Sequence, residues 1–299
     1  MKPEVIQLEY TIRRLNADDQ PLVNEMDTGI QDDYVLHVFE HLIHEDVLYG
    51  LFINNQLAIL GGYSIYGDSY AMLGRLRSDR RFRGQDLGSK LMLHVIDEAF
   101  QDERIHWIGA NTQEDNLPAR RVLTKLGLVP LETLHGAITK NATMLESGAE
   151  PWKEINDLPR KKEWLEKMFI QSGALFPYEC YYPLPATWSL FKDEEITKWN
   201  FYENPSNTRC LITKIDRKGH HYLHVIYPWN DFTQQDGLWE TVSRDYHDLL
   251  RQTQDEERET YIWKDLTKDE VTLLPDHHEF ELPSAWILHG MSRDEWIER

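Results

Sequence analysis

The pattern of hydrophobic and polar residues predicts a strand, a loop and a long helix between residues 71 and 100. In residues 71–78 polar side chains interrupt the apolar ones, as in a half-buried strand. From Leu87 to Phe100 apolar residues recur at helical spacing and form one face of a helix. The loop between these two elements spans residues 83–88 and reads Arg-Gly-Gln-Asp-Leu-Gly.

This loop is a candidate anion site. A strand that ends in a glycine-containing loop and leads into a helix directs unpaired backbone N–H groups toward one point. The positive end of the helix dipole lies at the same point, so the arrangement suits a phosphate group. Five arginines surround the loop and form the one basic patch of the sequence: Arg75, Arg77, Arg80, Arg81 and Arg83. This patch suits an anionic cofactor better than a nucleic-acid duplex.

Other elements of the first half follow from similar patterns. A second helix is predicted from Asn116 to Lys125, and a strand at 105–110 lies between it and the first helix. The remaining predictions are a strand at 9–15, a helix beginning near Gln20, a helix capped by Asp32 or Asp33, a hairpin of strands 48–53 and 56–64, and a final strand pair around 131–143.

A polar break containing glycine and proline, residues 146–151, predicts a boundary between two domains, 1–146 and 152–299. After the break the elements recur in the order of residues 56–143: a hairpin of strands 209–215 and 222–227, a loop at 228–237, a helix from Leu238, and strands at 261–263 and 285–289. We interpret this half as a degenerate repeat of the first that does not bind the cofactor; an unrelated α+β domain is the alternative.

Two motifs in the first half resemble motifs A and B of the GNAT acetyltransferase superfamily. Motif A of that family reads Arg/Gln-x-x-Gly-x-Gly/Ala, and motif B reads Asn-x-x-Ala-x-x-x-Tyr-x-Lys-x-Gly-Phe. The matching positions here are Arg83, Asp86 and Gly88 for motif A, and Asn116, Ala119, Leu123, Lys125, Gly127 and Leu128 for motif B.

The resemblance covers about the first half of the chain and implies a GNAT acyl-CoA N-acyltransferase fold of the α/β (α+β) class with a mixed central sheet. Together with the repeated order of elements in the second half, it predicts two tandem GNAT-like domains. It implies acetyl-CoA as cofactor, with the pyrophosphate on the loop amides and the pantetheine beside the preceding strand. The implied cofactor-binding residues are Leu76, Arg77, Ser78, Arg83, Gly84, Gln85, Asp86, Leu87, Gly88, Ser89, Lys90, Asn111, Asn116 and Ala119.

The sequence departs from the family pattern at two positions. Asp86 stands where the family usually has glycine, so a carboxylate would lie near the phosphates; alternatively, its side chain caps the helix and occupies the same amides. Leu123 stands where many members have a tyrosine that protonates the thiolate leaving group. We therefore predict an N-acetyltransferase acting on a small amine or peptide amine, with a non-catalytic acyl-CoA-binding or regulatory protein as the alternative.

The catalytic residues are not identified by the sequence. His106, Glu114 and Asp115 are the nearest candidate bases, and a chain of water molecules would serve as well. Residues 37–41 match the zinc-protease pattern His-x-x-Glu-His, and His44 adds a third imidazole. Because the pattern is short and His is frequent in this sequence, we interpret this helix as solvated or substrate-facing and predict no metal site.

Composition limits the partners. The 299 residues carry 32 Lys and Arg against 51 Asp and Glu, a net charge of -19 that disfavours nucleic acid and anionic membranes as partners. Cys180 and Cys210 are too few for a disulfide framework, and no apolar run is long enough to span a membrane. We expect a cytoplasmic protein; a homodimer remains an open alternative for its assembly.

Overall fold

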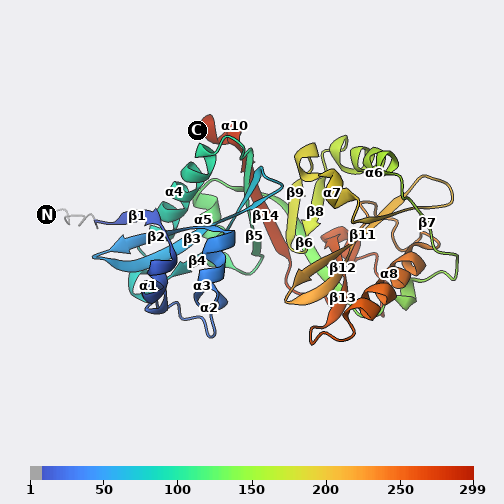
Figure 1. Ribbon diagram of the computed structural model, residues 1–299, viewed down its shortest axis with the longest axis horizontal. Coiled ribbons are helices and arrows are strands. Elements are labelled where there is room, and N and C mark those ends of the chain that lie inside the picture. Colours follow the sequence, from blue (N-terminus) through green and yellow to red (C-terminus); the bar gives the residue numbers. More distant parts are fainter. Residues whose placement is uncertain (1–8) are drawn as a thin grey trace. The chain divides into compact units, whose positions relative to one another are not determined.

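The computed structural model describes residues 9–299, which divide into two compact units (Figure 1). Unit 1 comprises the chain up to Thr112 together with Asn116–Leu131 and His289–Arg299. Unit 2 comprises Gln113–Asp115 and Glu132–Leu288. This division differs from the predicted boundary at residues 146–152, because the chain passes into unit 2 within a strand and the last eleven residues return to unit 1.

Unit 1 is built on a mixed sheet with the strand order β1-β2-β3-β4-β5-β14. Its strands are β1 (Thr11–Arg14), β2 (Val47–Ile53), β3 (Gln56–Tyr66), β4 (Tyr70–Ser78), β5 (Trp107–Gln113) and the end of β14 (Trp286–Ser292). The first four strands pair in antiparallel fashion, whereas β4 and β5 are parallel and are joined by a helical crossover. The predicted hairpin and the predicted strands around the loop are confirmed.

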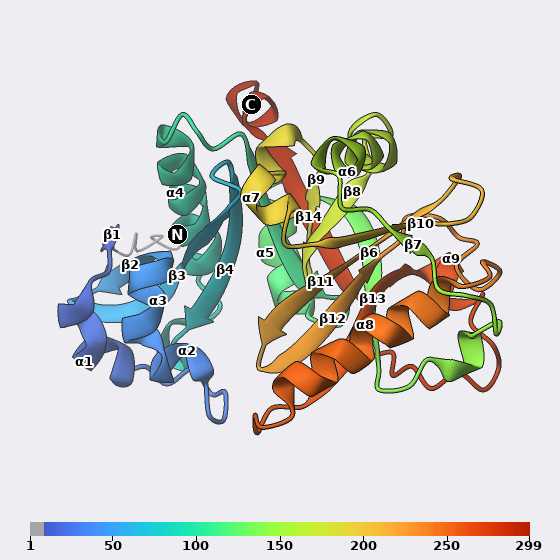
Figure 2. The same cartoon turned by 45° about the vertical axis from the view of Figure 1, so that its right-hand side comes forward.

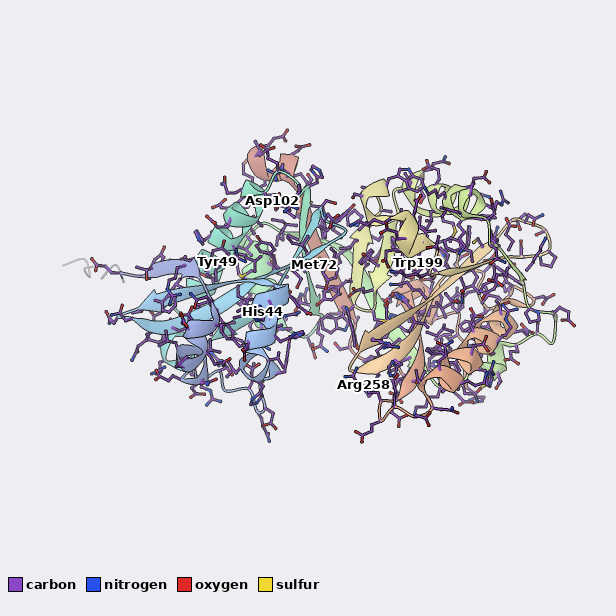
Figure 3. The ribbon with its side chains drawn as sticks, viewed as in Figure 1. His44, Tyr49, Met72, Asp102, Trp199 and Arg258 are labelled. Atoms are coloured by element: carbon purple, nitrogen blue, oxygen red, sulfur yellow. The ribbon has the colours of Figure 1, made fainter. Side chains whose placement is uncertain are left out.

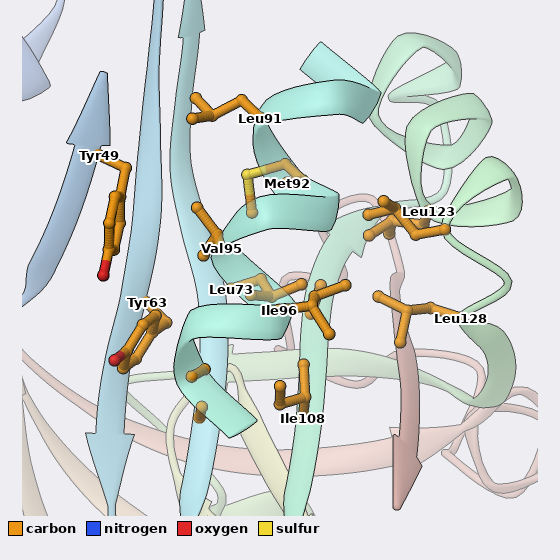
Figure 4. Close-up of a cluster of buried hydrophobic side chains, with 14 of the residues drawn as sticks. Tyr49, Tyr63, Leu73, Leu91, Met92, Val95, Ile96, Ile108, Leu123 and Leu128 are labelled. Atoms are coloured by element: carbon orange, nitrogen blue, oxygen red, sulfur yellow. The ribbon is translucent and has the colours of Figure 1, made fainter. Parts of the chain in front are cut away.

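Helices cover both faces of this sheet. The helices of unit 1 are α1 (Gln20–Asn24), α2 (Tyr34–His37), α3 (Phe39–Glu45), α4 (Leu87–Gln101), α5 (Leu117–Lys125) and α10 (Arg293–Ile297). Because side chains alternate along a strand, Leu51 packs in the core beneath α4, while Leu48 and Phe52 pack in the core beneath α1 and α3. Figure 4 shows Leu91 and Val95 of α4 in the first of these cores.

The C-terminal segment completes unit 1. The backbone N–H of Arg293 donates to the carbonyl of His106 over 2.8 Å, and its side chain donates to the carbonyls of Phe100, Asp102 and Ile105. Met291 is buried in the core beneath α4. The predicted strand pair at 131–143 is therefore wrong: the last strand of this sheet comes from the other end of the chain.

Residues 131–143 instead lie mostly in one long strand, β6 (Val129–Thr139), which from Glu132 belongs to unit 2. The strand order of unit 2 is β6-β13-β12-β11-β10-β7. The other strands are β7 (Lys153–Glu154), β10 (Asn200–Glu203), β11 (Cys210–Lys218), β12 (His220–Ile226) and β13 (Thr260–Thr267), with a separate hairpin of β8 (Leu175–Glu179) and β9 (Tyr182–Pro185).

The element order of unit 2 repeats that of unit 1. Strands β11 and β12 form an antiparallel hairpin, and helix α8 (Leu238–Thr253) connects β12 to the parallel strand β13, as α4 connects β4 to β5. Helix α8 lies along one face of this sheet (Figure 2). The remaining helices of unit 2 are α6 (Leu158–Leu165), which continues into a π-helical turn at Glu166–Ile170, α7 (Asp193–Ile196) and α9 (Lys268–Val271). Short 3-10 turns occur in unit 1 at Ala17–Asp19 and Arg80–Phe82, and in unit 2 at Thr143–Leu145 and Trp188–Leu190. Among residues 9–299 no helix has the length and apolar character that a membrane crossing needs.

Candidate functional site

Strands β4 and β5 separate part-way along their length. Their parallel pairing joins Tyr70–Leu73 to Trp107–Ala110 and goes no farther. Next to this point β4 contains a bulge. Gly74 pairs with Gly62 of β3 and Arg77 pairs with Leu60, so three steps along β4 face only two steps along β3. Arg75 within the bulge has φ 60°, which is the left-handed conformation. The bulge turns the end of β4 away from β5 and leaves room between them for a thin ligand.

A cleft of about 660 Å³ lies at this end of β4, and all its lining residues belong to unit 1. It is lined by every predicted cofactor-binding residue except Lys90 and Asn111: Leu76, Arg77, Ser78, Arg83, Gly84, Gln85, Asp86, Leu87, Gly88, Ser89, Asn116 and Ala119. The sequence analysis missed the others: Thr28, Ile30, Ile59, Phe82, Pro118, Arg121, Val122 and Lys125. Pro118, Arg121, Val122 and Lys125 were predictable together, because their spacing of i, i+3, i+4 and i+7 places them on one face of the helix that begins after Asn116. Thr28 and Ile30 carry no sequence signal.

Free backbone donors line one side of the cleft. Within the part of the chain that the structure describes, the N–H groups of residues 84–89 donate to no protein acceptor. Gly84 and Asp86 have φ 78° and φ 58°, left-handed conformations that turn the loop into the first turn of α4. A side chain at Gly84 would meet no atom within 4 Å, and one at Gly88 only Leu76 and Val122 at 3.9 Å. The loop is therefore open toward the cleft and presents the positive end of α4.

The carboxylate of Asp86 is directed away from these amides. Its Oδ1 accepts hydrogen bonds from Lys125 Nζ at 2.6 Å and from Ser89 Oγ at 2.8 Å, which hold the pKa of Asp86 below its usual range. It makes no side-chain capping bond to α4, so the alternative that Asp86 occupies the loop amides is wrong. The backbone conformation explains why glycine suits this position, since φ is positive, and why aspartate is tolerated.

Most of the arginine patch is paired with acids. Arg77 Nε donates to Asp33 at 2.7 and 2.8 Å, and the other pairs are Arg75 with Asp46, Arg80 with Asp27, and Arg81 with Asp79. Arg83 instead donates from Nη2 to the carbonyl of Thr28 at 2.5 Å and to that of Ser78 at 3.3 Å. Arg83 thus fastens the loop before α2 to the wall of the cleft.

The described residues that line the cleft supply no histidine or tyrosine that could act as a general base. Among the described residues of the cleft the only carboxylate is that of Asp86. His106 does not line it, and Glu114 and Asp115 belong to unit 2. Leu123, at the position of the family tyrosine, is 7% exposed and packs in the core beneath α4 (Figure 4). These positions therefore supply neither acid nor base to the cleft.

The helix that carries the zinc-protease pattern is interrupted. Helix α2 ends at His37, α3 begins at Phe39, and Val38 between them has the non-helical angles φ -106° and ψ 18°. His41 and His44 both belong to α3, and His44 is labelled in Figure 3. The continuous helix that would bring His37 and His41 onto one metal is thus not formed.

In unit 2 the corresponding helix start is covered by the chain itself. Gly237 precedes α8 with φ 80°, as Asp86 precedes α4, but its N–H donates to Ser147 Oγ at 3.1 Å. The indole of Trp152 donates to the carbonyl of Asp236 at 2.7 Å and is 2% exposed. Where the pairing of β12 with β13 ends, the buried Lys264 donates to the carbonyl of Tyr227. Side chains fill the positions that are open in unit 1.

Residues 11–128 match the model of the acetyltransferase (GNAT) family. These residues form a GNAT acetyltransferase domain. No curated protein matches the sequence. The predicted assignment of the first half of the chain to this superfamily is confirmed.

Solved structures resemble the chain over nearly its whole length. A GCN5-related N-acetyltransferase from Sphaerobacter thermophilus is 13% identical, with a TM-score of 0.56 over 96% of this chain and 97% of its own. A candidate acetyltransferase from Thermoplasma acidophilum is 16% identical, with a TM-score of 0.54 over 94% of this chain and 99% of its own. One from Pyrococcus horikoshii is 11% identical, with a TM-score of 0.51 over 95% of this chain and 89% of its own. At these identities the likeness concerns the fold, and the predicted GNAT fold class is confirmed.

Proposed function

We propose that the protein is an acetyl-CoA-dependent N-acetyltransferase. One observation supports this above all: within residues 9–299 the N–H groups of residues 84–89 have no protein acceptor, and these residues line a cleft beside the parted strands β4 and β5. Such amides at the start of a helix bind phosphate oxygens. The family match of residues 11–128 makes the diphosphate of CoA the natural ligand.

The residues present fit this cofactor. The amides of residues 84–89 would hold the pyrophosphate, and Arg121 on α5 adds positive charge at the cleft, where Lys125 neutralises Asp86. The backbone of Leu76–Ser78, beyond the last pairing with β5, would hold the pantetheine opposite Asn116 and Ala119. When bound, acetyl-CoA supplies a thioester carbonyl that an amine nitrogen attacks directly.

The protein would contribute mainly by positioning. Holding the two reactants in one orientation removes much of the entropic barrier of a bimolecular reaction. The only carboxylate among the described cleft-lining residues, that of Asp86, is paired with Lys125 and has a lowered pKa, so it is a poor base, and we propose that water carries the proton away from the attacking amine. The acceptor would be a small amine or a peptide amine, and the net charge of -19 favours a cationic one. The two buried free cysteines fit a cytoplasmic setting.

A second candidate function is a non-catalytic acyl-CoA-binding protein. The burial of Leu123 in the core and the cleft without a base favour it, because both remove side chains that would assist the chemical step. The two candidates share the binding site and differ only in turnover.

Calorimetric titration tests the shared site. We expect acetyl-CoA to bind once per chain, and acetyl-pantetheine, which lacks the diphosphate, to bind far more weakly. No heat with either compound at millimolar concentration would contradict both candidates. Release of free thiol from acetyl-CoA with any member of an amine panel then supports the transferase, whereas binding without release across the panel supports the second candidate.

A further inference from the structure

A buried group of potential metal ligands lies in unit 2, apart from the cleft. Cys180 offers Sγ, Asp216 a carboxylate oxygen and His224 a ring nitrogen, and these atoms all lie within 4.8 Å of one another. Cys180 and His224 are 0% exposed and Asp216 is 8% exposed. Among residues 9–299 this is the only such group of three His, Cys, Asp or Glu.

Three elements bring these residues together. Asp216 lies on β11 and His224 on the neighbouring strand β12. Asp216 pairs with Tyr222, two residues before His224, so the two ligands are diagonal neighbours across the hairpin. Cys180 lies in the turn between β8 and β9. This turn is held over the sheet, because the N–H of Cys180 donates to Asp216 Oδ2 at 2.8 Å and Lys218 Nζ donates to the carbonyl of Cys180 at 2.8 Å.

A second carboxylate orients the imidazole. Nδ1 of His224 lies 3.1 Å from Asp216 Oδ2, and Nε2 lies 3.0 Å from Asp265 Oδ2 on β13. A histidine that binds a metal through one nitrogen commonly donates its other N–H to a carboxylate, which fixes the tautomer and raises ligand basicity. Asp265 stands in that place.

We propose that Cys180, Asp216 and His224 bind a zinc ion within unit 2. Thiolate, imidazole and carboxylate are the ligands that Zn²⁺ takes in proteins, and a water or a carbonyl would complete four-coordination. Lys214 Nζ lies 2.9 Å from Asp216 Oδ1, whereas Oδ2 accepts from the N–H of Cys180 and faces Nδ1 of His224, so the ion would lie between Oδ2 and Nδ1 in place of a proton. The sequence did not indicate this site because its ligands come from three separate elements.

The residues around the site supply negative charge for a cation. Two carboxylates, those of Asp216 and Asp265, flank the ring of His224, and Lys214 Nζ lies 2.9 Å from Asp216 Oδ1. Zinc would bind the thiolate of Cys180, so the thiol proton would leave to the solvent as the ion enters.

The competing explanation is a buried ion network without metal. In that case the imidazole of His224 joins Asp216 to Asp265 by hydrogen bonds, and the thiol of Cys180 binds no ion. The two explanations differ in metal content and in the role of the thiol, both of which can be measured on the full chain independently of any transferase activity.

The test uses protein made without a histidine tag and purified without chelators. Mass spectrometry for metals is expected to find about one zinc per folded chain, and a Cys180→Ser variant is expected to lose at least about tenfold in zinc affinity. Cys210→Ser is the matched control, because Cys210 is also fully buried but lies outside the cluster; it should retain its zinc. Circular dichroism establishes that each variant is folded.

A second measurement does not depend on the variants folding. Wild-type protein refolded with Co²⁺ should show a thiolate charge-transfer absorption band, and refolding with Zn²⁺ should raise its melting temperature over refolding with chelator. Wild-type protein that holds no zinc as purified and gains none on refolding with Zn²⁺ would overturn the proposal in favour of the ion network. Equal zinc in Cys180→Ser and wild type would overturn it by placing the metal elsewhere.

Discussion

Replacing Asp86 separates two effects that one residue combines. Its backbone has φ 58°, which glycine adopts freely, asparagine tolerates and alanine resists. Its carboxylate adds a negative charge beside the amides that we propose bind a diphosphate, although Lys125 at 2.6 Å partly neutralises it. Asp86→Asn therefore changes the charge alone, Asp86→Ala changes charge and backbone fit, and Asp86→Gly removes the charge while suiting the backbone.

Coulomb's law gives the order of magnitude of the expected change in binding free energy. A unit charge about 6 Å from a phosphate charge is repelled by roughly 3 kcal/mol at an effective dielectric near 20. Pairing with Lys125 and the half-exposed position of both side chains reduce this, so we expect about 1 kcal/mol to remain, or roughly a fivefold change in Kd. The left-handed backbone should cost Asp86→Ala about 1–2 kcal/mol of unfolding free energy relative to Asp86→Gly.

Calorimetry with acetyl-CoA at low and high salt, together with chemical denaturation, measures both effects. We expect Asp86→Asn and Asp86→Gly to bind more tightly at low salt, with a difference that shrinks at about 1 M salt, where the Debye length is about 3 Å. Asp32→Asn is the control, since Asp32 is exposed, has φ 50° and does not line the cleft. Equal affinity of Asp86→Asn and wild type at low salt would refute the charge argument, and equal stability of the Ala and Gly variants would refute the backbone argument.

Three further predictions follow from single contacts. Gly88→Ala adds a methyl group to the first turn of α4, which should stabilise the fold by up to about 1 kcal/mol, but the methyl group also enters the cleft and should weaken acetyl-CoA binding. Gly74→Ala is the control, because a methyl group at Gly74 would meet no atom within 4 Å and Gly74 does not line the cleft, so binding should be unchanged. Arg83→Lys loses the paired carbonyl contacts and should speed hydrogen exchange in residues 27–33, as mass spectrometry can measure. Hydrogen bonds from Arg81 hold the pKa of the buried Asp79 at about 2. Asp79→Asn should therefore cost roughly 2 kcal/mol of unfolding free energy at neutral pH.

The sign of the last effect gives it a pH signature. A carboxylate whose pKa is lower in the folded than in the unfolded protein stabilises the fold above the unfolded value, near 4, and loses this contribution as the pH falls toward 2. The stability difference between wild type and Asp79→Asn should narrow over that interval, and a difference independent of pH would contradict the assignment. For Gly88→Ala the contradicting result is unchanged affinity, and for Arg83→Lys it is unchanged exchange in residues 27–33.

Local signals in the sequence determined most elements of the chain. Helix α4, the loop before it and the hairpin of β2 and β3 were predicted because apolar spacing and glycine positions act within a few residues. Most residues that line the cleft could also be predicted from the sequence. The end of β4, the loop 83–88 and the start of α4 follow one another in the chain, and the second motif, from Asn116 onward, supplied residues of α5. The repeated order of elements after residue 209 was visible for the same reason.

The tertiary structure alone decided where side chains far apart in sequence meet. The carboxylate of Asp86 turns toward Lys125, 39 residues away, and so leaves the loop amides free. Residues of β14 pair with the free edge of β5 in unit 1, and the sequence did not reveal this. An exposed strand edge offers backbone groups that any other strand can pair with, so the partner is not encoded in the side chains nearby. Leu123 turns into the core, and Cys180, Asp216 and His224 converge from separate elements, since burial and packing depend on the whole unit and not on local spacing.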